Sequence, residues 1–267
     1  MEDLKVAGLQ QAIIWGDIEQ NLEALEVAWE KAPKADVYLL PETFATGFAT
    51  DQADLKDLAQ PPTGGAPAAH LAAWAIRKKA WVGGTVFVQE ANHRYRNRFF
   101  LAGPDGALQY YDKRHRFGIA GEKDFFDGGD RRLIVEIKGW HLLLAVCYDL
   151  RFPVWLRQQM AAGVPEYDGM LIPANWPSPR QYAWDTLLRA RAMENQCYVL
   201  GVNRVGMDGL GIAHEGGTVS IGPWGDQRAA ANSAESGWIV DTWEAVHLAA
   251  VRKRYPFLGD ADAFDLE

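Results

Sequence analysis

The sequence predicts an α/β fold in which helices cover the outer faces of a mixed β-sheet. Strand-like and helix-like patterns alternate along the chain, and two hairpin signals interrupt the alternation. Hydrophobic residues make up 48% of the 267 residues, and 11 residues are tryptophan, enough for a large core. No repeat, low-complexity tract or linker divides the chain, so we expect residues 1–267 to form a single domain.

In the first half of the chain, apolar runs predict strands and 3.6-residue periodicity predicts helices. Asp17 is placed to cap the first helix. The breakers Pro61-Pro62 and Gly64-Gly65 predict a loop over residues 50–67, and the turn Gly103–Gly106 predicts a hairpin. The expected strands are 6–11, 37–40, 81–89, 98–102 and 107–111, and the expected helices are 17–31 and 68–79.

In the second half, Gly139-Trp140 predicts another hairpin, between strands 133–137 and 141–146. Gly206–Gly217 carries five glycines and predicts a flexible or tightly turning loop. This alternation is also compatible with one doubly wound open sheet. The further expected strands are 169–173, 197–203 and 238–241, and the expected helices are 154–162, 184–195 and 242–251.

Composition excludes several classes of function. The net charge is -8, and the densest basic cluster, Lys113-Arg114 with Arg116, is short, which argues against a nucleic-acid partner. The two cysteines, the absence of a signal-peptide pattern and the absence of a membrane-length apolar run predict a cytoplasmic protein. Six scattered histidines and no dinucleotide fingerprint predict that no metal or other cofactor is bound.

Three reactive side chains each follow an apolar strand, where α/β sheets collect their sites. Glu42 follows the strand 37–40, Lys113 follows the first hairpin, and Cys147 follows the strand 141–146. A cysteine is nucleophilic only as the thiolate, so it needs a base or a neighbouring cation. A glutamate can take the proton, and a lysine can stabilise a developing oxyanion.

Each of these residues also has a structural explanation. A lone cysteine on a buried strand is more often a small core residue, and we expect this of Cys197. A glutamate after a strand is usually a turn residue, and a lysine there is usually solvated. A redox thiol is a further alternative, but Cys147 has no second cysteine at CxxC spacing. The residues alone therefore predict an α/β protein with a candidate catalytic thiol.

The segments around these residues resemble the three signature blocks of the nitrilase superfamily of carbon–nitrogen hydrolases. The similarity extends over about residues 4 to 260, and within the superfamily the segments 147–153 and 175–177 are most similar to the omega-amidase branch. The three blocks are Leu40-Pro41-Glu42-Thr43-Phe44, Tyr111-Asp112-Lys113-Arg114-His115 and Val146-Cys147-Tyr148-Asp149-Leu150-Arg151-Phe152-Pro153.

The resemblance implies a four-layer α-β-β-α sandwich that pairs into a homodimer. It also implies that Glu42 is the general base, Lys113 the cation beside the oxyanion, and Cys147 the nucleophile of an acyl transfer through a thioester. The backbone N–H of Tyr148 would share the oxyanion with Lys113. A second glutamate supports such sites, and Glu122 is the candidate, with a solvated loop carboxylate as the alternative.

An omega-amidase would take a short dicarboxylate monoamide, such as 2-oxoglutaramate or succinamate, whose distal carboxylate needs a cation or several hydrogen-bond donors. Arg151 could instead be structural and pair with Asp149 or a backbone carbonyl. A nitrilase or an N-carbamoyl amidohydrolase would use the same catalytic residues, and a non-catalytic scaffold would need none of them. The expected substrate-binding residues are Arg114, Arg116, Phe117, Arg151, Asn175 and Trp176, together with the side chain of Tyr148.

Overall fold

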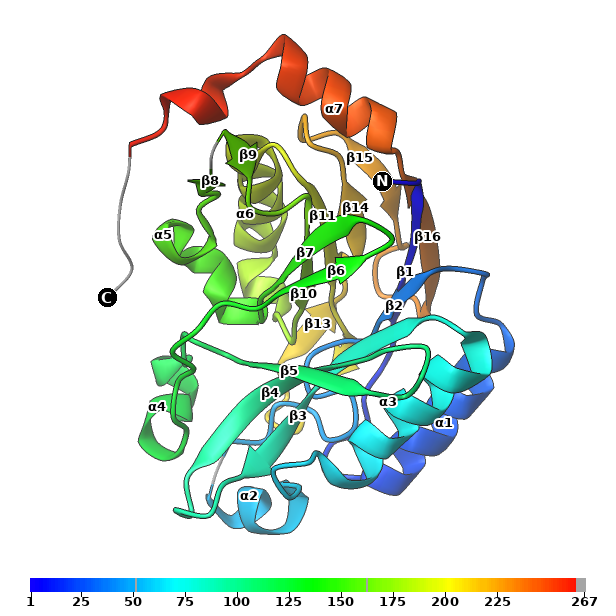
Figure 1. Cartoon of the computed structure of the whole chain (residues 1–267). Coiled ribbons are helices and arrows are strands. Elements are labelled where there is room, and N and C mark those ends of the chain that lie inside the picture. The colour runs from blue at the N-terminus through cyan, green and yellow to red at the C-terminus, as the bar shows by residue number, and fades with distance from the viewer. Residues whose placement is uncertain (51, 162, 263–267) are drawn as a thin grey trace.

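In a computed structural model that describes residues 1–50, 52–161 and 163–262, two large β-sheets lie between outer layers of helices (Figure 1). Each sheet has six strands. The four-layer α-β-β-α sandwich is thereby confirmed, and the single doubly wound sheet that the pattern also allowed is not what the chain forms.

The first sheet has the strand order β16-β1-β2-β3-β4-β5. Its centre is parallel, because β1 pairs with β2 and β2 with β3 in parallel, and its flanking pairs are antiparallel. The strands are β1 (Leu4–Gln10), β2 (Val37–Leu39), β3 (Trp81–Gln89), β4 (Tyr95–Ala102), β5 (Leu108–Asp112) and β16 (Gly237–Trp243).

The second sheet repeats this plan with the order β15-β14-β11-β10-β7-β6. Strands β7, β10 and β11 form its parallel centre, and β6, β14 and β15 complete it by antiparallel pairing. The strands are β6 (Ile134–Ile137), β7 (Trp140–Leu144), β10 (Gly169–Pro173), β11 (Tyr198–Val202), β14 (Val219–Ile221) and β15 (Gln227–Ala230).

The helices α1 and α3 pack on the first sheet, and α6 packs on the second. Asp17 caps α1, as predicted, by accepting a hydrogen bond from the N–H of Gln20, and α1 buries Leu22, Leu25 and Trp29. The helices are α1 (Ile18–Glu30), α2 (Gln52–Leu58), α3 (Gly65–Lys78), α4 (Glu122–Phe125), α5 (Pro153–Leu156), α6 (Gln181–Asn195) and α7 (Ala245–Arg254).

Short elements complete the chain and lie mainly in its loops. Four are 3₁₀ helices and four are strands of two small ribbons. They are η1 (Gly118–Ala120), η2 (Cys147–Arg151), η3 (Ser178–Arg180), η4 (Phe257–Asp260), β8 (Met160–Ala161) with β9 (Val164–Pro165), and β12 (Val205–Met207) with β13 (Ala213–Glu215).

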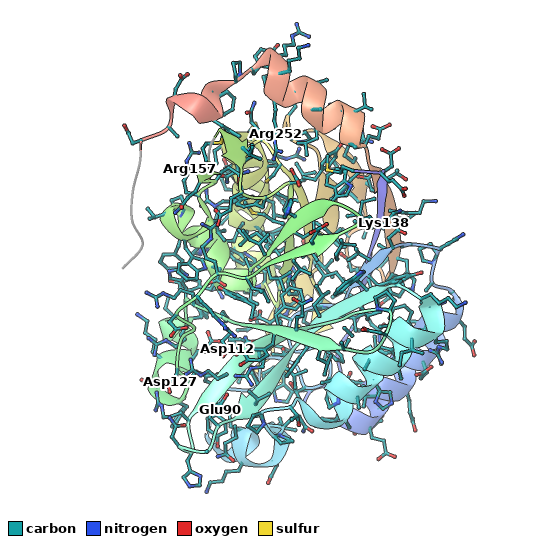
Figure 2. The ribbon with its side chains drawn as sticks, viewed as in Figure 1. Glu90, Asp112, Asp127, Lys138, Arg157 and Arg252 are labelled. Carbon is teal, nitrogen blue, oxygen red and sulfur yellow. The ribbon has the colours of Figure 1, made fainter. Side chains whose placement is uncertain are left out.

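The two sheets pack closely through their inner faces. A Cβ atom at Gly8 of β1 would lie 2.7 Å from Val202 Cγ2 of β11, so the glycine permits this approach. Lys138, in the β6–β7 turn of the second sheet, donates at 3.0 Å to Asp36 Oδ2, just before β2 of the first sheet, and so links the two sheets (Figure 2). The inner faces thus set the positions of the loops that follow the strands.

Helix α7 is fastened to the second sheet by Arg252 (Figure 2). Its guanidinium donates to Asp168 Oδ1 at 2.7 Å and to the carbonyl of Tyr167 at 2.7 Å.

Within the described part of the chain, no helix is both long and apolar enough to cross a membrane.

Several predicted elements differ from the structure. The predicted loop 50–67 contains helix α2, and the predicted helix 154–162 ends at Leu156, within the described residues. Beyond it, the N–H of Gln158 donates to Asn195 Oδ1 at 2.8 Å, so a contact with α6 replaces helical bonding. The predicted loop 206–217 includes the ribbon β12–β13, and the strands β14 and β15 were not predicted.

Candidate active site

Four polar side chains follow strands of both sheets and meet between them. Glu42 follows β2 and Lys113 follows β5 in the first sheet, while Cys147 follows β7 and Asn175 follows β10 in the second. The strands β2, β7 and β10 belong to the parallel centres of their sheets, whose carboxyl ends carry sites in α/β folds. The face-to-face packing therefore brings together residues that are far apart in the sequence.

A buried ion cluster lies at the centre of this region. Lys113 Nζ donates to Glu42 Oε1 at 2.9 Å and to Glu122 Oε1 and Oε2 at 3.1 and 3.0 Å. Lys113 is 1% exposed, and both glutamates are fully buried. Glu122 is therefore not a solvated loop carboxylate. Asn97, on β4, donates to Glu42 Oε1 at 2.7 Å, and the N–H of Asn175 donates to Glu42 Oε2 at 2.9 Å.

Burial and mutual charge decide the protonation of the cluster. Burial by itself disfavours the ammonium of Lys113, but the carboxylates of Glu122 and Glu42 outweigh it, so the Lys113 pKa is raised. Burial raises the pKa of Glu122, Lys113 lowers it and Glu42 raises it, with a net increase. Burial also raises the pKa of the Cys147 thiol, and the Glu42 carboxylate adds to the effect. The resting thiol therefore keeps its proton beside Glu42.

Cys147 stands at a sharp turn between β7 and η2. Its φ is 43°, in the left-handed region that non-glycine residues rarely adopt, and its side chain is 8% exposed. The backbone N–H of Tyr148 lies in the first turn of η2, where N–H groups have no intrahelical acceptor. The turn can therefore present a thiol together with a hydrogen-bond donor, a combination suited to acyl transfer.

Asp149 ties this turn to the segment that carries Lys113. Its fully buried carboxylate accepts from the N–H of Val146 at 3.0 Å and the hydroxyl of Tyr111 at 2.8 Å through Oδ2. Through Oδ1 it accepts from the N–H of His115 at 2.9 Å, and it lies 2.8 Å from His115 Nδ1. One carboxylate thus joins the residue before Cys147 to a residue just after Lys113.

The Asp149→Asn substitution should lower kcat about 10- to 100-fold with KM nearly unchanged. The new amide group would point an N–H donor at the backbone N–H of Val146 or of His115, and the repulsion would shift the turn that carries Cys147. Steady-state kinetics measure both constants. Tyr111→Phe removes one of the four hydrogen bonds that the Asp149 carboxylate makes, and it should lower kcat less. An unchanged kcat in Asp149→Asn would show that the tie does not position Cys147.

A cavity of about 240 Å³ opens beside Cys147 and Lys113. Most of its wall is apolar or aromatic, and its size suits a small molecule rather than a drug-sized one. Four of the predicted substrate-binding residues line it, together with the side chain of Tyr148. The lining is Phe48, Thr50, Lys113, Phe117, Ile119, Cys147, Tyr148, Arg151, Asn175, Trp176, Pro177, Arg180, Asp208, Leu210, Ile212 and His214.

The structure separates the predicted arginines into two groups. Arg151 lines the cavity with its guanidinium 4.7 Å from the centre of the Trp176 ring, and Asp149, its suggested structural partner, is bound elsewhere. Arg114 and Arg116 line a different hollow and donate to the carbonyls of Gly129 and Phe126. These two predicted substrate-binding residues therefore do not line the cavity beside Cys147, because motif proximity does not set side-chain direction.

The sequence reasoning missed several residues around the cavity. Arg180 ends η3 and stands over the Phe117 ring at 5.1 Å, and Asn97 holds Glu42 from β4. His214 and Asp208 come from the ribbon β12–β13 and its turn. Arg180 lies just beyond the segment 175–177 and could have been found there, whereas no pattern pointed to the ribbon.

Two further expectations concern cysteine and metal. Cys197 is fully buried in the core, as predicted. The described residues contain no group of three or more His, Cys, Asp or Glu side chains that could hold a metal ion.

Comparisons with known proteins give one consistent result. The model of the carbon-nitrogen hydrolase family matches residues 5–253. The omega-amidase YafV of Yersinia enterocolitica is 40% identical over 264 residues, 99% of each chain. The 2-oxoglutaramate amidase of Bacillus subtilis is 32% identical over 258 residues, 96% of each chain. The solved structure of XC1258 from Xanthomonas campestris, a CN-hydrolase superfamily protein with an arsenic adduct in its active site, has a TM-score of 0.95 and 38% identity over 100% of both chains.

Proposed function

Since this chain belongs to the carbon-nitrogen hydrolase family and is a hydrolase that acts on amides, we propose that it is an omega-amidase with Glu42, Lys113 and Cys147 as its catalytic residues. The observation that carries the proposal is the buried cluster in which the Cys147 thiol meets Glu42 and Lys113, beside a cavity that Arg151 lines. A structural cysteine has no need of these neighbours.

In the first step, Cys147 Sγ forms a bond to the amide carbon while its proton passes to Glu42. The raised pKa of the thiol means that proton transfer accompanies the attack. Lys113 Nζ and the N–H of Tyr148 stabilise the oxyanion, a role worth about 3–4 kcal/mol per donor. Glu42 then gives the proton to the amide nitrogen, the C–N bond breaks, and ammonia leaves a thioester on Cys147.

In the second step, Glu42 takes a proton from a water molecule, and the oxygen of that water attacks the thioester carbon. The C–S bond breaks, the sulfur regains its proton from Glu42, and the carboxylic acid leaves. Asn97 and the N–H of Asn175 hold the Glu42 carboxylate in place for both proton transfers. Glu122 keeps Lys113 charged and oriented.

The proposed substrates are short dicarboxylate monoamides. Arg151 supplies a cation at the cavity wall, and its planar guanidinium can bind a carboxylate through two hydrogen bonds. The substrates implied by the names of the omega-amidase and 2-oxoglutaramate amidase relatives agree with this chemistry. The single-domain organisation, the homodimer and the cytoplasmic location remain predictions.

The proposal predicts that ammonia is released from succinamate and 2-oxoglutaramate with a kcat/KM at least about 100-fold higher than from butyramide, which lacks the carboxylate. Arg151→Met should remove most of that advantage and leave butyramide turnover nearly unchanged. A coupled assay for ammonia measures both. Arg77→Met, on the exposed face of α3, is the matched control.

Two outcomes would contradict the proposal. Turnover of nitriles or N-carbamoyl amino acids, without ammonia release from either dicarboxylate monoamide, would assign the same catalytic residues to another carbon–nitrogen hydrolase reaction. Equal turnover of succinamate and butyramide would show that the cavity does not recognise a carboxylate.

A further inference from the structure

The cavity contains a second arginine, Arg180, which the proposed mechanism does not use. Its guanidinium stacks on Phe117, as that of Arg151 stacks on Trp176. Among the residues that the structure describes, no ion pair joins a carboxylate to either guanidinium. Both cations therefore face the cavity with hydrogen-bond donors left over.

One buried residue holds both arginines. The Trp176 ring lies under Arg151, and its Nε1–H donates to the carbonyl of Arg180 at 2.8 Å. Trp176 is 3% exposed and is itself fixed, because its backbone N–H donates to Asn203 Oδ1 at 2.8 Å. The bond fixes the backbone of Arg180, and the ring contacts with Trp176 and Phe117 orient the two guanidinium groups, which lowers the entropic cost of binding an anion.

Among the described ionisable groups at the cavity, none forms an ion pair with either guanidinium. Burial lowers the pKa of His214 to about 4, and the nearby Arg204 lowers it further, so His214 is neutral at neutral pH. Asp208 also lines the cavity, but its Oδ1 accepts from the N–H groups of Leu210 and Ile212 at 2.9 and 2.8 Å. Lys113 is engaged by Glu42 and Glu122.

We propose that Arg151 and Arg180 together form a clamp for a 2-oxo carboxylate, and that Arg180 determines the preference for 2-oxo acid amides over plain ones. A carboxylate has two oxygens, which one guanidinium fork satisfies. A 2-oxo carboxylate adds a third acceptor oxygen beside them, and Arg180 supplies donors for it. This inference rests on the proposed omega-amidase function and specifies its substrate class.

The test compares 2-oxoglutaramate with glutaramate, which has the same chain length and lacks only the 2-oxo oxygen. In the wild-type protein we expect a higher kcat/KM for 2-oxoglutaramate. Arg180→Met should lower the ratio of the two kcat/KM values about tenfold or more, mainly because the oxo substrate binds more weakly and its KM rises. Arg180→Lys, which keeps the charge but not the fork, should restore part of the ratio.

The controls separate the outcomes. Arg151→Met should weaken the binding of both substrates, because both carry the carboxylate. Arg131→Met, at an exposed position outside the cavity, should leave both kcat/KM values unchanged. A wild-type ratio near one, or a ratio that Arg180→Met leaves unchanged, overturns the clamp while omega-amidase activity stands. If neither monoamide is hydrolysed but butyramide is, the proposed function itself fails.

Discussion

Replacing Cys147 by alanine should abolish amide hydrolysis, with kcat reduced by about 10⁴-fold or more, because no thioester can form. The fold should persist. Alanine is smaller than cysteine and apolar, so the free energy of unfolding should change by only about 1 kcal/mol. Ammonia release and urea unfolding measure the two effects.

The second cysteine provides a matched control. Cys197 is also buried, but it lies in the core just before β11 and outside the cluster of Glu42 and Lys113. Cys197→Ala should therefore retain activity. Mass spectrometry of the enzyme quenched during turnover should find an acyl group on Cys147 in the wild type. Persistent turnover in Cys147→Ala, or an acyl group on Cys197, would remove Cys147 from the mechanism.

Replacing Lys113 by methionine should affect both activity and stability. The loss of the oxyanion cation should lower kcat about 10²- to 10³-fold. Within the described cluster, Lys113 is the cation that pairs with both Glu42 and Glu122. Its loss should also lower the free energy of unfolding by about 3–5 kcal/mol, because the two glutamates are left as buried, unpaired carboxylates. Lys123→Met, at an exposed position on α4, should change neither quantity.

The stability loss in Lys113→Met should depend on pH. The Glu122 pKa is raised by burial and by Glu42 above its ordinary value of 4.5, and removing Lys113 takes away a lowering influence. A group whose pKa is raised in the folded state favours folding below its unfolded pKa and loses that contribution as pH rises through the folded pKa. The variant should therefore be less destabilised near about pH 5 than near about pH 8. Equal destabilisation at both pH values would contradict this electrostatic account.

Local sequence determined the elements whose signals lie within a few residues. The cap at Asp17, the hairpin at Gly139-Trp140 and the apolar strands before Glu42 and Cys147 depend on neighbouring side chains and were predicted. Helix α2 was missed, because the breakers that follow it dominated the pattern. The helix predicted over 154–162 was too long, because a contact between Gln158 and Asn195 on α6 replaces its last turns.

The candidate site follows the same division. The sequence by itself determined three reactive residues at strand ends and, through the family resemblance, a carbon–nitrogen hydrolase. Only the tertiary structure decided that Glu122 is buried against Lys113, that Arg114 and Arg116 face another hollow, and that Arg180 joins Arg151 in the cavity. The physical reason is that a strand end is set by local pattern, whereas the direction and partners of a loop side chain depend on two sheets packing face to face.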